Sequence, residues 1–161
     1  MTLRYHPHEH HALIHSQFVP IYRVGGVSHV IDRIPPTGRH LVVVHYYLHP
    51  MFAHLSVTHN RLLMLKAAME RTLSRNKNVV FVFRGPHVTS LDTSWSHSIG
   101  GNVHGILLLN IVREIFKSLQ DQVIFIDGWD MSVAMENPVY HPAGMAMEMV
   151  KLILSFVCKS E

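Results

Sequence analysis

Three short segments of almost continuous apolar residues constrain the fold of this chain more than any other feature. They read LVVVHYY at residues 41–47, VVFVF at 79–83 and QVIFI at 122–126. Runs rich in β-branched and aromatic residues are typical of strands that are buried on both faces. A weaker candidate strand, Phe18–Arg23, precedes them and ends at a pair of glycines.

Helical patterns separate these strands. A short helix is predicted over Val27–Ile34, where two prolines end it, and a long one over Ser56–Ser74. A third helix is predicted from Asn102, as its N-cap, to about Leu119, and Ala143–Val157 forms the closing helix. Strands that alternate with helices indicate an α/β fold with a parallel sheet and right-handed crossovers. The side chains expected to face the core are Leu62, Leu65, Met69 and Leu73 in the long helix, and Val103, Ile106, Leu107, Ile111 and Ile115 in the third.

Composition excludes several classes of protein. With 161 residues, 48% of them hydrophobic and 16% charged, the chain is long and apolar enough for one globular domain. The net charge is only +3 and Lys/Arg residues are scattered, so we expect no nucleic-acid partner. No apolar stretch reaches the roughly 18 residues of a membrane-spanning helix, and the N-terminus lacks the apolar core of a signal peptide. We expect no cofactor.

Histidine is abundant, with fifteen in the chain. Because chemistry in parallel sheets collects in the loops that follow the strands, His49, His87 and His141 could converge on one rim, with His49 and His87 as weak substrate-binding candidates. The alternative is that they are ordinary loop histidines. The N-terminal segment 1–16 is also rich in histidine, but Ala12 stands where an HExxH motif needs histidine. We therefore expect a poorly ordered tail there and no metal site.

The segment 123–142, VIFIDGWDMSVAMENPVYHP, joins the last strand to an acidic, aromatic turn and a histidine beside a proline. A histidine in this position, His141, is a candidate general base. Trp129 could form a sugar-stacking wall, or could pack under the loop as part of the core. No GxSxG motif or GDS motif occurs in the chain, so a recognisable serine nucleophile for His141 is missing.

Several segments in order carry a resemblance to a known family: IDRI, VVVH followed by His49, KAAMER, GGNVHG, IDGWDMSVA, HP and finally Cys158. Together they resemble the C-terminal domain of the neurexophilin and PC-esterase (NXPE) family, a branch of the SGNH-hydrolase-like proteins. The likeness extends from about Arg4 to Cys158, and the IDGWDM segment followed by HP is its most specific part.

The resemblance implies a flavodoxin-like α/β/α sandwich, and a site for ester hydrolysis or acyl transfer on glycan-like substrates. His141 matches the histidine of that site, and Asp130 is a weak candidate for its acid, since Pro138 stands where the acid is expected. The first strand and its GDS serine have no counterpart here. Residues 17–161 would therefore be a partial domain with strand edges left unpaired, which favours aggregation or rescue by another chain.

The resemblance also implies a secreted or lumenal protein, in which Cys158 would pair with a cysteine outside this sequence. Two functions remain open. The longer protein could be an acyl-ester hydrolase or O-acyltransferase, or the domain could be a non-catalytic module that binds glycan or extracellular protein. For this chain alone we expect no esterase activity.

Overall fold

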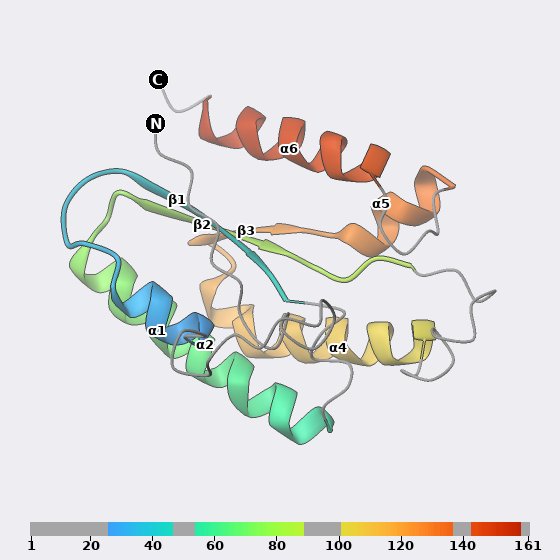
Figure 1. The fold of residues 1–161 in the computed structure, drawn as a ribbon, viewed down its shortest axis with the longest axis horizontal. Coiled ribbons are helices and arrows are strands. Elements are labelled where there is room, and N and C mark those ends of the chain that lie inside the picture. The colour runs from blue at the N-terminus through green and yellow to red at the C-terminus, as the bar shows by residue number, and fades with distance from the viewer. Residues whose placement is uncertain (1–25, 47–53, 89–100, 137–142, 159–161) are drawn as a thin grey trace, which may run out of the picture.

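The computed structural model describes residues 26–46, 54–88, 101–136 and 143–158. In this part of the chain a sheet of three parallel strands, in the order β1-β2-β3, lies between two layers of helices (Figure 1). The strands are β1 (His40–His45), β2 (Val79–Arg84) and β3 (Val123–Ile126). This arrangement confirms the predicted α/β class and is consistent with a flavodoxin-like sandwich. The candidate strand Phe18–Arg23 and the segment 1–16 lie outside the described residues.

One face of the sheet carries the larger core. The helices α1 (Val27–Asp32), α2 (Leu55–Arg75) and α4 (Gly101–Phe116) lie on this side, and the 3₁₀ turn η4 (Lys117–Leu119) continues α4 (Figure 1). Because side chains alternate along a strand, every second residue of β2 points into this layer, including Phe81 and Phe83. All four side chains predicted to line the inner face of the long helix are buried in this core: Leu62, Leu65, Met69 and Leu73.

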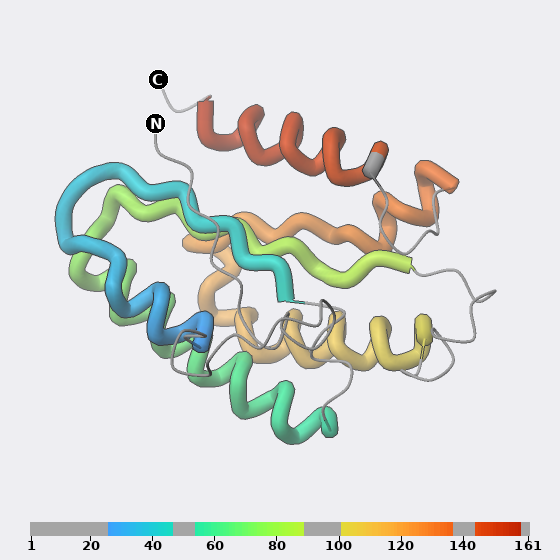
Figure 2. The backbone as a smooth tube through the Cα atoms, viewed as in Figure 1, coloured from blue at the N-terminus to red at the C-terminus, as the bar shows by residue number. Residues whose placement is uncertain are grey.

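The other face is covered by α6 (Ala143–Val157), with α5 (Gly128–Ala134) beside its N-terminus (Figure 1). The α6 bounds match the predicted closing helix. Met145, Met149 and Ile153 of α6 form a second core with Val82 and Ile126 of the sheet. Met145 and Met149 therefore fill packing space, whereas Met135 and Met147 are exposed. The tube drawing in Figure 2 shows α6 running back along the strands toward the end of the sheet where they begin.

The prediction that LVVVHYY is buried on both faces is wrong for one face. Val44 is buried in the larger core, but Leu41 and Val43 are 42% and 49% exposed on the side of α6. Val43 pairs with Val82, which α6 covers, so the covered area stops at β2. In the described part of the chain no strand pairs with the outer edge of β1.

The predicted inner face of the third helix is also partly wrong. Ile115 is buried and Ile111 packs against the core, but Val103, Ile106 and Leu107 are exposed. The helix begins at Gly101, so Asn102 lies inside it and is not its N-cap. The buried face is built on Gly105, Leu108 and Val112, which lie on one side of the helix at three- and four-residue spacing. Apolar residues occur on nearly every side of this helix, so the sequence alone does not show which side faces the core.

A loop ties α1 and α2 to the start of β1. The side-chain amide of Asn76, at the end of α2, donates to the carbonyl oxygens of Pro35 and Gly38 at 3.0 and 3.1 Å. The guanidinium of Arg75 donates to the carbonyl oxygens at the end of α1, including that of Asp32 at 2.8 Å. These bonds fix where β1 enters the sheet and therefore the position of its carboxyl end.

Candidate functional site

The three strands end level with one another. His45 of β1 is in register with Arg84 of β2, and Arg84 with Ile126 of β3. Because side chains at paired positions point to the same face, His45, Arg84 and Ile126 all project toward the α6 layer. The carboxyl ends of parallel strands are where α/β proteins place their ligands.

Arg84 is the most unusual residue at this rim. It ends the otherwise apolar strand VVFVFR and is half-buried. Its Nε atom is buried and has no hydrogen-bond partner in the described part of the chain. Burial lowers the pKa of the Arg84 guanidinium, since removal from water disfavours the charged form. A cation in this state carries a desolvation cost that an anionic ligand would offset.

The rim is stiffened by close contact between the segment after β2 and the start of α5. The amide of Gly85 donates to the carbonyl of Ile126 at 3.0 Å. A Cβ on Gly128 would lie 2.8 Å from the carbonyl oxygen of Pro86 and 2.9 Å from that of Gly85, so only glycine fits there. The hydroxyl of Ser132 accepts from the amide of Val88 at 2.9 Å, which ties α5 to the same segment.

Asp127 connects this rim to α4. Its carboxylate caps α5 by accepting from the amides of Trp129 and Asp130 at 3.0 and 3.2 Å. It also pairs with the guanidinium of Arg113 on α4 at 2.5 Å. These contacts give Asp127 a structural role, because its carboxylate oxygens are already used to cap a helix and to hold an ion pair.

The predicted site residues are distributed unevenly. His49 and His141 lie outside the described residues. The hydroxyl of Ser132 accepts from the amide of Val88, which follows His87, and donates to the carbonyl oxygen of Trp129. The side chain of His87 is only 2% exposed, whereas Trp129 is half-buried and Asp130 is exposed. Arg84 is not among the site residues predicted from the sequence. A single charged residue at the end of an apolar strand could have pointed to it.

Two further features bear on function. In the described segments no three His, Cys, Asp or Glu residues lie together as a metal site, and no helix there is long and apolar enough to span a membrane. Cys158, just after α6, is exposed and has a free thiol.

Comparison with known families decides the assignment. The family model described as "NXPE family member 4-like, C-terminal domain" matches residues 1–158. The chain belongs to the NXPE family. The match covers nearly all of the 161 residues, and therefore confirms the resemblance carried by IDRI, GGNVHG and IDGWDMSVA. No solved structure matches this NXPE domain.

Proposed function

We propose that this NXPE domain is a non-catalytic binding module for glycans that carry carboxylate or sulfate groups. The ligand would bind at the carboxyl end of the sheet, and the protein would act in the secretory lumen or outside the cell. Arg84 is the observation that carries the proposal, because a half-buried guanidinium whose Nε has no hydrogen-bond partner among the described residues is suited to pair with an anion.

Two other residues that follow or end strands at the carboxyl end of the sheet suit such a ligand. His45 is adjacent in register and on the same face, and Trp129 follows β3 on α5. A histidine can add a hydrogen bond to a sugar hydroxyl, and a half-buried tryptophan offers an apolar face for a sugar ring. These groups would supplement the charge contact and give preference for a saccharide over a simple anion.

The competing function is ester hydrolysis or acyl transfer with His141 as the base. The sequence contains no GDS or GxSxG serine to be activated. Asp127 is engaged in capping α5 and in an ion pair with Arg113, and the candidate acid Asp130 is exposed. The missing serine motif is therefore the main reason to favour binding over catalysis, because a general base needs a nucleophile to activate.

The binding proposal is tested with immobilised chondroitin sulfate and hyaluronan as probes. We expect the purified chain to bind at least one of them, and Arg84→Gln to weaken binding by about tenfold or more, the loss expected for a charge-assisted hydrogen bond. Arg33→Gln, which removes an exposed arginine after α1, is the matched control and should change binding little. Equal losses in both variants would reduce the effect to net charge and overturn the proposal.

Catalysis is tested separately with 4-nitrophenyl acetate and acetylated sugars. We expect hydrolysis by the purified chain to stay at the buffer background. Turnover above background that His141→Ala abolishes would instead establish the chain as an esterase.

A further inference from the structure

A pocket of about 330 Å³ opens at the outer edge of β3, between that strand and the second half of α4. It lies on the face of the sheet that carries Phe83 and Phe125 and is thus opposite to Arg84. Its lining comes from β2, β3, α4 and the turn that follows α4. It shares Gly85, Ile126 and the Arg113–Asp127 pair with the rim at the carboxyl end of the sheet, but neither Arg84, His45 nor Trp129 lines it.

Three aromatic rings form the floor of this pocket. The ring centroids of Phe83 and Phe116 are 5.1 Å apart, and that of Phe125 is about 6 Å from each, at 6.0 and 6.1 Å. Phe83 and Phe116 are buried, but Phe125 is 39% exposed because β3 is the last strand of the described sheet. Phe125 packs against two buried rings, so it forms a preformed apolar surface. An apolar part of a ligand could bind there without rearrangement of these side chains.

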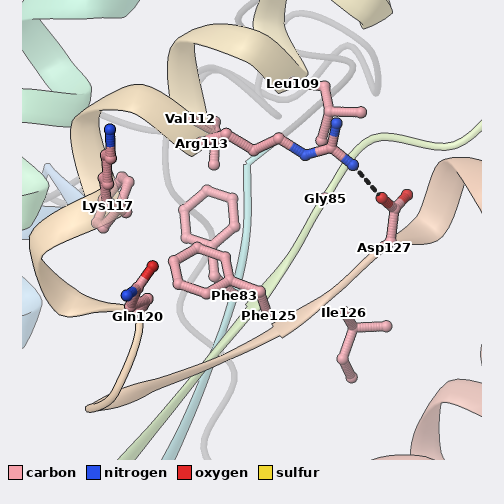
Figure 3. Close-up of a pocket in the computed structure, with 11 residues that line it drawn as sticks. Phe83, Gly85, Leu109, Val112, Arg113, Lys117, Gln120, Phe125, Ile126 and Asp127 are labelled. Atoms are coloured by element: carbon pink, nitrogen blue, oxygen red, sulfur yellow. Dashed lines mark hydrogen bonds and ion pairs between the residues drawn. The ribbon is translucent and has the colours of Figure 1, made fainter.

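Charged and polar groups stand around the opening. Figure 3 shows the Arg113–Asp127 pair on one side of the rings and Lys117, with Gln120 below it, on the other. Asp127 neutralises Arg113, whereas the Lys117 ammonium has no hydrogen-bond or ion-pair partner in the described part of the chain. The rim therefore presents one uncompensated positive charge beside an apolar floor.

We propose that this pocket binds a small amphipathic carboxylate, with its hydrocarbon body on the phenylalanine rings and its carboxylate on Lys117. The volume is at the lower end of the roughly 300–1,000 Å³ found for small-molecule sites, which suits a ligand of modest size. The excess of positive charge at the rim selects an anionic head over a cationic one. The two binding surfaces are distinct, because the phenylalanine floor and Arg84 lie on opposite faces of the sheet.

The probe is decanoate, titrated into the full chain below its micellar range and followed by calorimetry, with 1-decanol as the neutral control. We expect saturable binding at one site per chain, with decanoate favoured over decanol. Lys117→Gln should weaken decanoate by about five- to tenfold and leave decanol unchanged, since only the charge contact is lost. Lys77→Gln, an exposed lysine in the turn before β2, is the matched control.

A second variant and a map of the binding site keep the test decisive. Phe125→Ala should weaken both ligands, and decanoate should shift the backbone amide resonances of Gln120 and Phe125 in nuclear magnetic resonance spectra. Absence of saturable binding, unchanged affinity in Lys117→Gln, or shifts confined to Leu41 and Val43 on the opposite face would each overturn the assignment. Binding by this pocket alone with no glycan binding would leave it standing and reject only the proposed function.

Discussion

At the scale of single residues, the described part of the chain contains buried side-chain nitrogens that make no hydrogen bond. The Nε2 atom of His104, in the first turn of α4, is buried and lacks a hydrogen-bond partner in the described part of the chain, as does Nε of Arg84. Burial lowers the pKa of each. Unsatisfied groups of this kind cost stability, and proteins keep them most often where a ligand or a partner completes them.

His104 gives the domain an acid-sensitive component of stability. Its pKa in the folded state lies below the ordinary value of about 6.5, so the unfolded chain takes up a proton first as the pH falls. The contribution of neutral His104 to the free energy of unfolding is therefore fully present above pH 6.5. It is lost as the pH falls through that value toward the folded pKa. We expect His104→Gln to flatten the dependence of the free energy of unfolding on pH between about 7 and 5. Urea unfolding at several pH values checks this.

The control is His59→Gln, which removes an exposed histidine from α2. If both variants keep the slope of the parent chain, His104 does not titrate differently in the folded and unfolded states.

At the scale of elements, the junction of β2 and α5 organises the rim. α5 is only seven residues long, yet Asp127 caps it and Ser132 ties it to the segment after β2. Such a short helix has little stability of its own, so its place depends on these contacts. The sequence predicts only an acidic turn here, because IDGWDM has too few residues to show helical periodicity.

Gly128→Ala tests this junction. The added methyl group would lie under 3 Å from two carbonyl oxygens, so backbone must move and we expect a loss of about 1–3 kcal/mol in the free energy of unfolding. Chemical denaturation monitored by circular dichroism measures it. Gly26→Ala is the control, since its Cβ would meet only the hydroxyl of Ser28 at 3.9 Å. A loss no greater than that of the control would mean that α5 shifts without cost.

At the scale of the whole molecule, α6 covers only part of its face of the sheet. A packed helix is about 10 Å wide and strands are about 4.8 Å apart, so one helix covers roughly two strands. α6 packs on β2 and β3, and Leu41 and Val43 of β1 remain exposed. α6 itself exposes Met147, Val150 and Leu154, and a helix that is apolar on most sides is typical of buried surroundings. The unpaired edge and the open face together favour association with another polypeptide.

Val43→Lys tests this surface. We expect the variant to keep its fold and to self-associate less than the parent chain, because the side chain is already half exposed. Light scattering on a sizing column over a range of concentrations measures the association. Val44→Lys, one residue along and on the buried face, should lose more than about 3 kcal/mol and unfold. Unfolding of Val43→Lys would show that the open face is in fact covered in solution.

The sequence by itself determined the elements. The apolar runs VVFVF and QVIFI predicted the strands β2 and β3, and the apolar spacing of α2 and the bounds of α6 followed from local periodicity. Tertiary structure decided orientation and environment. The core-facing side of α4, the exposure of Val43 and the burial of Arg84 Nε depend on which neighbours lie beside each element. Periodicity shows that a side of an element is apolar, but not whether another element covers it, because covering is a property of packing between distant segments.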